Sequence, residues 1–107
     1  MELLESELEK MAIEEIESHG MDVFKTPKFS DRKHAQRKKD KGAPDLWVFF
    51  RGRSIALEMK SEDGRQSDEQ KAFEARMRRQ SIPYFIAYSL DDVDNVIRAI
   101  KQLAIQP

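Results

Sequence analysis

Three charged side chains in the middle of the chain have the types and spacing needed to hydrolyse a phosphodiester. Asp45 precedes one apolar run, and Glu58 and Lys60 end the next. The dipeptide Arg51-Gly52 between the runs indicates a tight turn, so the two runs predict a β-hairpin. Counting outward from this turn puts Asp45 opposite Glu58, where Cβ atoms lie about 5 Å apart and like charges repel. Lys60 shares their face because side chains alternate along a strand.

Two adjacent carboxylates can be accommodated in three ways. One can be protonated, a cationic side chain can neutralise them, or a hard divalent ion such as Mg²⁺ can bridge their oxygens. The third arrangement would be hydrolytic, because a metal polarises a phosphoryl oxygen and lowers the pKa of its bound water. Lys60 could orient or deprotonate that water, or stabilise the charge on phosphorus. In a purely structural alternative, Asp45 begins a strand while Glu58 and Lys60 form an exposed edge pair.

Two polar residues on predicted helices are candidates to join this site. Residues 2–19 predict a helix with Glu5 near the centre of its apolar face, where a carboxylate needs a partner. Glu9 lies on the same side and is a rival, and a solvated first turn is the structural alternative. Gln70 shares the inward face of a later predicted helix, but it is also the expected capping-box partner of Ser67. Both roles of Gln70 remain open.

The net charge of −1 conceals a strong asymmetry. Residues 1–24 carry −7, residues 25–41 carry +6, and the remainder is neutral. A basic block in a neutral protein indicates a local anionic partner. Cations that neutralise phosphates bind DNA without sequence preference, whereas the structural alternative is a solvated loop. The predicted DNA-binding residues are Lys25, Lys28, Arg32, Lys33, Arg37, Lys38, Lys39 and Lys41.

Length and composition predict one small globular domain spanning residues 1–107. The chain is 39% hydrophobic and 36% charged. No apolar run approaches the roughly 20 residues of a membrane span, and no secretory signal opens the chain. The absence of cysteine excludes disulfides and thiolate metal sites. We therefore expect an intracellular, cytoplasmic protein with no membrane partner.

The remaining patterns predict the fold class. Strands are expected at 21–26 and 83–89, and a last helix follows Ser89. The element order is then α-β-β-β-α-β-α. Both faces of the hairpin are apolar, which predicts an α/β fold with a central mixed sheet flanked by helices. Trp47, Phe49 and Phe50 are expected in the core.

Three segments together resemble a known family. They are ESELEKMAIEEIESHG (5–20), KGAPDLWVFFRGRSIALEMKSEDGRQSDEQ (41–70) and IPYFIAYSLDDV (82–93). They resemble the virus-type replication-repair nuclease domain, VRR-NUC, of the PD-(D/E)xK nucleases, over nearly the whole chain. The resemblance implies a restriction-endonuclease-like fold and metal-dependent cleavage of branched DNA. Stand-alone members resemble Holliday-junction resolvases and tend to be homodimers, so a homodimer is expected.

The resemblance also implies a role for each candidate residue. The family's first-helix glutamate, Pro-Asp aspartate, Glu-x-Lys pair and helix glutamine fall on Glu5, Asp45, Glu58, Lys60 and Gln70. The carbonyl between glutamate and lysine, here that of Met59, commonly joins the metal shell. We therefore expect Mg²⁺ or Mn²⁺ to be held by Asp45, Glu58, Met59 and Glu5. The segment before Pro44 is longer and more basic than the family leads us to expect, which affects substrate geometry.

Two other functions remain open. One is a non-catalytic DNA-binding module that keeps a nuclease fold, although the intact acidic set argues against it. The other is an RNA-directed nuclease. The sequence indicates no aromatic stacking surface of the kind that favours single strands.

Overall fold

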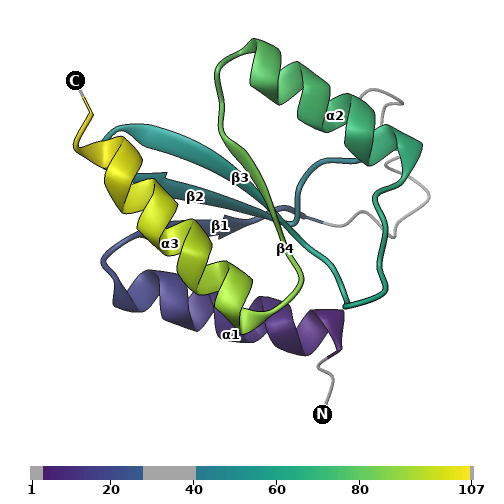
Figure 1. Cartoon of the computed structure of the whole chain (residues 1–107), viewed down its shortest axis with the longest axis horizontal. Coiled ribbons are helices and arrows are strands. Elements are labelled where there is room, and N and C mark those ends of the chain that lie inside the picture. The colour runs from purple at the N-terminus through teal and green to yellow at the C-terminus, as the bar shows by residue number, and fades with distance from the viewer. Residues whose placement is uncertain (1–3, 28–40, 107) are drawn as a thin grey trace.

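The computed structural model describes residues 4–27 and 41–106 (Figure 1). Its elements follow the predicted order α-β-β-β-α-β-α. They are α1 (Glu5–Ser18), β1 (Asp22–Lys25), β2 (Leu46–Phe50), β3 (Arg53–Met59), α2 (Asp68–Arg79), β4 (Tyr84–Ala87) and α3 (Leu90–Ala104). None of the helices in the described ranges is both long and apolar enough to cross a membrane.

The strands form one mixed sheet in the order β1-β2-β3-β4. The first three strands are antiparallel, and β4 runs parallel to β3. The predicted hairpin register is confirmed, with Phe50 opposite Arg53 and Trp47 opposite Ala56. Arg51 and Gly52 both have positive φ, 49° and 80°. This is the turn geometry that matches the twist of paired strands.

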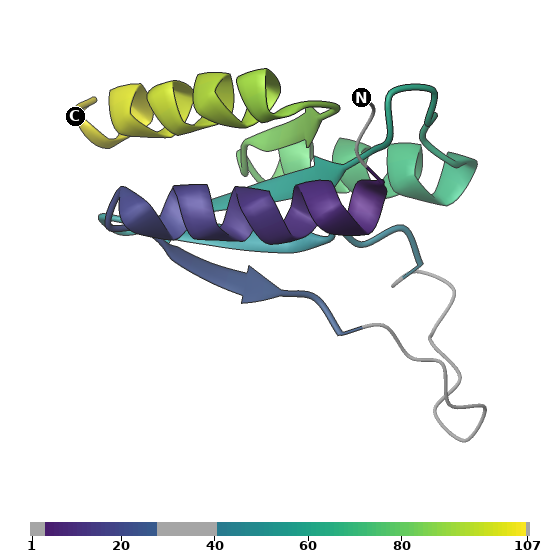
Figure 2. The ribbon, with the colours of Figure 1, turned by 90° about the horizontal axis from the view of Figure 1, so that it is seen from below.

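The helices lie on both sides of the sheet. In Figure 2, α1 lies in front of the sheet and α2 behind it, while α3 lies beside α1. The core forms between the sheet and the α1–α3 layer. Its members come from α1 (Leu8, Ala12, Ile16), the sheet (Leu46, Val48, Ile55, Leu57, Met59, Ala87) and α3 (Val93, Val96, Ile97, Ile100), together with Met21. The apolar face expected on the first helix is therefore confirmed.

The α2 side of the sheet is covered only in part. No residue of α2 is buried, and its Phe73 packs edge-on against Trp47 with ring centroids 6.5 Å apart. Phe24 and Phe49 remain 53% and 42% exposed. The expectation that Phe49 belongs to the core was wrong, because one short helix does not cover the β1 side of this face.

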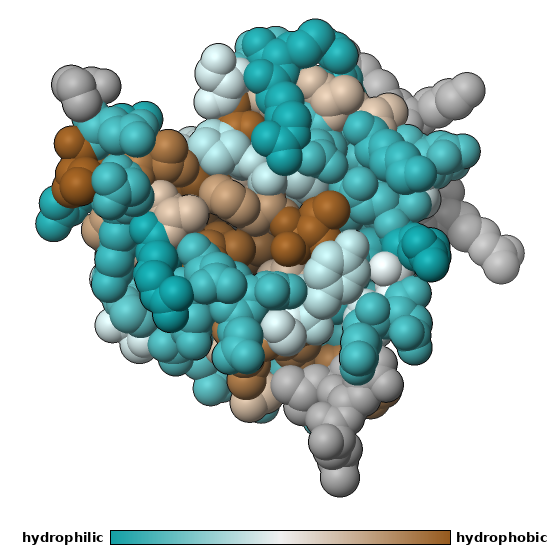
Figure 3. Space-filling model, viewed as in Figure 1, coloured by the Kyte–Doolittle hydropathy of each residue, from teal (hydrophilic) through white to brown (hydrophobic). Residues whose placement is uncertain are grey.

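β4 is an edge strand whose ends are protected. Arg78 Nη2 donates to the Tyr84 carbonyl at 3.2 Å, and Asp92 Oδ2 accepts from the Tyr88 amide at 2.8 Å. Such contacts block strand pairing with another chain. Hydrophobic surface nevertheless gathers at the centre of Figure 3, between α3 and α2, where β4 forms the edge.

Candidate active site

Asp45 and Glu58 lie together where the hairpin strands start and end. The β2–β3 ladder stops at Leu46 and Leu57, and its next pair would be Asp45 and Glu58. Asp45 Oδ2 accepts a hydrogen bond from the Met59 amide at 2.8 Å. This bond joins the start of β2 to the end of β3, so the predicted juxtaposition of the two carboxylates is confirmed.

Pro44 changes the backbone hydrogen bonding beside these carboxylates. Pairs that exchange ladder hydrogen bonds recur at every second residue, so Pro44 would follow Leu46 as such a partner, opposite Met59. Proline has no amide hydrogen, so it cannot donate to the Met59 carbonyl. The Met59 amide bonds the Asp45 side chain instead. The Met59 carbonyl lacks this donor, and its role as a metal ligand, which the resemblance implies, stays a prediction.

Glu58 is fully buried, with 0% of its surface exposed. Its Oε1 accepts from Gln70 Nε2 at 2.8 Å, whereas its Oε2 is buried without a hydrogen-bond partner. Burial raises the pKa of Glu58 to about 7, the charge of Lys60 lowers it, the charge of Asp45 raises it further, and the polar side chains of Gln66 and Tyr84, which lie near this carboxylate, lower it. A buried acceptor without a partner lowers the stability of the fold, which indicates that Oε2 is placed to bind a ligand.

Gln70 performs both roles that the sequence left open. Its side-chain Oε1 accepts a hydrogen bond from the Ser67 backbone amide at 2.8 Å, and its own backbone amide donates to Ser67 Oγ at 3.1 Å. This capping box fixes the first turn of α2 and leaves Nε2 to bond Glu58. Gly42 has φ +85°, and a Cβ there would lie 2.3 Å from the Glu69 carbonyl oxygen. The chain before Asp45 therefore packs directly on this first turn.

Comparison with known proteins identifies the fold. No protein-family model matches the chain, and the search of curated proteins gives no match. Among solved structures, a chain named "VRR_NUC domain" matches with a TM-score of 0.71 and 28% identity, over 88% of this chain and 94% of its own. A "VRR_NUC domain protein" has the same fold, with a TM-score of 0.65, 20% identity, and coverage of 94% and 87%.

The chain folds as a VRR-NUC domain. The predicted resemblance and fold class are confirmed, and the likeness supports a nuclease-family domain. Within the VRR-NUC domain, Asp45 and Glu58 fit a hard divalent ion. The fit rests on two carboxylates, one of which has a buried oxygen without a partner. Mg²⁺ commonly needs only one or two protein carboxylates and keeps several waters.

Glu5 does not form a cluster with Asp45 and Glu58. Across residues 4–27 and 41–106, no three His, Cys, Asp or Glu side chains are grouped so that they could hold a metal ion. Glu5 is half-buried in the first turn of α1. Its rival Glu9 is bonded to Lys25, with 2.9 Å between Glu9 Oε1 and Lys25 Nζ. Of these two carboxylates, Glu5 therefore remains the candidate that could reach the ion.

Lys60 follows the carboxylates directly. Its side chain is half-buried, and its charge lowers the pKa of Glu58 more than any other neighbouring group does. Gly64 ends a turn from Ser61, and a Cβ at Gly64 would lie 3.2 Å from Lys60 Cδ. This turn therefore restricts where the Lys60 ammonium can point.

The described residues include two members of the predicted basic block, Lys25 and Lys41. Lys28, Arg32, Lys33, Arg37, Lys38 and Lys39 lie outside the described residues. Lys41 is exposed just before Gly42. Lys25 bonds Glu9, whose helix covers the opposite face of the sheet from Asp45. Alternation along β1 points Lys25 toward α1, so its prediction as a phosphate contact loses support.

Sequence reasoning missed two hydroxyl groups beside the carboxylates. Tyr84 is 3% exposed, and neither its hydroxyl nor Thr26 Oγ1 has a hydrogen-bond partner. Burial, with the nearby charge of Glu58, raises the pKa of Tyr84 above its usual value. Thr26 donates its backbone amide to the Asp45 carbonyl at 2.9 Å. The buried side-chain oxygens without partners in the described ranges are those of Thr26, Glu58 and Tyr84.

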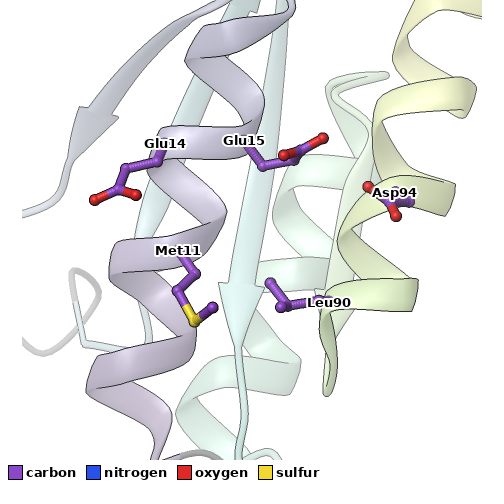
Figure 4. A pocket seen from close by; sticks show the side chains of 5 residues that line it. All are labelled: Met11, Glu14, Glu15, Leu90 and Asp94. Carbon is purple, nitrogen blue, oxygen red and sulfur yellow. The ribbon is translucent and has the colours of Figure 1, made fainter.

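A hollow lies between α1 and α3, away from the candidate active site. It is lined by Met11, Glu14, Glu15, Leu90 and Asp94. Figure 4 shows Glu15 and Asp94 pointing toward each other across it, while Glu14 points away. Its carboxylates belong to the helices on the other side of the sheet from α2. Their charge would repel a phosphate backbone, so this hollow is unsuited to DNA.

Proposed function

We propose that this VRR-NUC domain is a metal-dependent, structure-selective DNA endonuclease. One observation carries the proposal: buried Glu58 is held by Gln70 through one oxygen and has no partner for the other, beside Asp45 and Lys60. An ionised carboxylate in this position is unfavourable without a cation and becomes favourable when a cation binds. Such an arrangement is typical of a functional site that carries a cost in stability.

Asp45, Glu58 and the Met59 carbonyl would hold Mg²⁺ or Mn²⁺, and Glu5, which is not grouped with the other two carboxylates, would contact the ion through a water. When bound, such an ion polarises the phosphoryl oxygen and makes a bound water more acidic. The protein's own part is positioning. The Met59 amide orients Asp45, and Gln70 orients Glu58.

Lys60 would act on the reacting groups. Its ammonium lies close enough to Glu58 to lower the pKa of that carboxyl. From there it would orient the attacking water and stabilise the negative charge that develops on the phosphoryl oxygens. Hydrolysis forms a bond from the water oxygen to phosphorus and breaks one phosphoester bond. The attacking water gives up one proton to solvent, and the leaving oxygen takes up one proton from solvent.

The alternative is a DNA-binding module that does not cleave. It predicts salt-dependent DNA binding that is indifferent to divalent ions. The buried carboxylate argues against it, because a binding module gains nothing from a buried carboxylate with one unsatisfied oxygen. Replacing Glu58 by an apolar residue would stabilise such a module without loss of function.

We further propose a homodimer that acts on branched DNA such as Holliday junctions. One domain carries a single set of Asp45, Glu58 and Lys60, whereas resolving a four-way junction requires two symmetric cuts. A two-fold dimer supplies two such sets. Sedimentation at micromolar concentration tests the assembly. A monomer of 12.5 kDa that still cuts both strands of a junction would contradict it.

A substrate panel tests the proposed function. Duplex, flap, splayed-arm and four-way-junction DNA would each be incubated with the protein, with Mg²⁺, Mn²⁺ or EDTA. We expect metal-dependent cleavage of at least one branched substrate, and its loss in Glu58→Gln. Binding without cleavage in any metal would support the alternative. The corresponding RNA substrates test the remaining possibility of an RNA-directed nuclease.

A further inference from the structure

Three aromatic side chains share the sheet face that carries the candidate active site. Phe24 on β1 is the direct partner of Trp47 on β2. Phe49 follows Trp47 by two residues and therefore points the same way. Trp47 contacts Phe73 of α2, and α2 also supplies the Gln70 contact to Glu58. The three aromatic residues and the carboxylates thus lie on one face.

Two of these rings are open to solvent. Phe24 is 53% exposed and Phe49 is 42% exposed, and Trp47 between them is half-buried. A single exposed apolar residue is ordinary. Neighbouring exposed aromatic residues on a functional face indicate a binding surface.

The distance to the carboxylates limits what can occupy this surface. Asp45 precedes Trp47 by two residues and Phe49 by four, which corresponds to about 7 Å and about 13 Å along an extended strand. A protein partner placed over these rings would obstruct the approach of DNA to Asp45. A nucleic-acid strand that crosses both the rings and the carboxylates would not.

We propose that Phe24, Trp47 and Phe49 form a stacking platform for unpaired bases next to the scissile phosphate. The proposal rests on the proposed nuclease function and specifies its substrate. Bases inside a duplex are stacked on each other and are unavailable to protein rings, whereas unpaired bases stack on aromatic side chains. Sheets that present two or three aromatic rings bind two or three bases in this way.

The platform selects the class of substrate. DNA with an unpaired segment beside the cut, such as a flap or a splayed arm, gains stacking that plain duplex lacks. Loss of one stacking ring commonly weakens binding of a single strand by about tenfold or more. The sequence prediction that no such surface exists is therefore replaced by this proposal, because Phe24 is exposed and Phe49, which was expected in the core, is exposed as well.

Tryptophan fluorescence provides a direct test, because Trp47 is the only tryptophan in the chain. The full chain would be titrated with a 20-nucleotide oligothymidine and with a duplex of equal length, in EDTA so that no cleavage occurs. We expect the single strand to quench Trp47 and the duplex to leave its emission nearly unchanged. Phe24→Ala and Phe49→Ala should each weaken single-strand binding by about tenfold.

Met11→Ala is the matched control. Met11 is 41% exposed but lies on α1, on the other side of the sheet, so this variant should bind like the wild type. Thermal melts would verify folding, and Phe24→Leu and Phe49→Leu would replace any alanine variant that melts earlier. Absent quenching, equal quenching by duplex, or equal losses in Met11→Ala would each overturn the platform.

A second copy of the chain is the competing occupant. It would make Trp47 emission depend on protein concentration without DNA, in parallel with dimer formation in sedimentation. That result would also overturn the platform. Binding to the platform is measured without metal and cleavage is measured with metal. The two experiments can therefore refute the platform and the nuclease function independently. Single-strand quenching without cleavage in Mg²⁺ or Mn²⁺ would sustain the platform and refute the nuclease.

Discussion

Replacing Glu58 by glutamine should stabilise the metal-free protein at pH 8, although it removes a central site residue. Burial raises the pKa of Glu58 from 4.5 to about 7, so the folded protein binds the proton of the Glu58 carboxyl group more tightly than the unfolded chain does. The associated stability is present in full below about pH 4.5 and is lost as the pH rises through about 7. Glutamine carries no charge, and its carbonyl oxygen can still accept the hydrogen bond from Gln70.

The expected size follows from the two pKa values. Their difference, at about 1.4 kcal/mol per pKa unit, corresponds to roughly 3 kcal/mol of unfolding free energy when Glu58 is fully ionised. Most of this cost is absent at pH 5, where the folded protein keeps Glu58 protonated. The stability advantage of Glu58→Gln should therefore grow by roughly 2–3 kcal/mol between pH 5 and pH 8. In a chain of this size that is about 10 °C or more in Tm.

Urea unfolding in EDTA at pH 5, 6, 7 and 8 measures this difference. Glu62→Gln is the matched control, because Glu62 is an exposed glutamate in the loop after β3. Its stability should parallel that of the wild type at every pH. The unfolding free energy of Glu58→Gln should rise increasingly above that of the wild type once the pH exceeds 6. A constant difference from the wild type over the whole range would refute a buried Glu58 carboxylate that is costly to ionise.

Three further substitutions test the surrounding positions. Lys60→Ala should slow cleavage by about 10²- to 10³-fold while metal affinity, measured by calorimetry, stays within a few-fold; an equal loss of metal affinity would contradict its assignment to the chemical step. Gly42→Ala should lower the Tm and weaken metal binding, because a Cβ there would lie 2.3 Å from backbone at the first turn of α2 and displace Gln70; an unchanged Tm would show that the contact is not tight. Tyr84→Phe should slow cleavage yet leave the Tm equal or higher, because it removes a buried hydroxyl without a partner; a lower Tm would show that the hydroxyl is bonded in the fold.

Much of the fold could be predicted because its signals are local. Alternating apolar residues and the two-residue turn at Arg51-Gly52 determine the hairpin register, which in turn brings Asp45 next to Glu58. Ser67 and Gln70 have capping-box spacing, which marks the start of α2. These features involve neighbours in sequence or in one hairpin, so pattern and spacing suffice.

The missed features depend on contacts distant in sequence. The position of Tyr84 beside Glu58 depends on the parallel pairing of β3 with β4, and no local pattern predicts that register. The exposure of Phe49 depends on how much of the sheet α2 covers, which its own apolar pattern does not indicate. The pairing of Lys25 with Glu9 joins β1 to α1 across the core side. The sequence does not indicate this ion pair, because Lys25 stands there at the start of a basic block.

The most direct test of the central claim is single-turnover cleavage of the best substrate from the branched-DNA panel. The wild type, Glu58→Gln and Lys60→Ala would be compared in Mg²⁺, Mn²⁺ and EDTA, with DNA binding measured in parallel. We predict cleavage by the wild type only with a divalent ion, and at least a hundredfold slower cleavage by both variants despite retained binding. Cleavage in EDTA, or undiminished cleavage by Glu58→Gln, would contradict a metal-dependent site built on Asp45, Glu58 and Lys60.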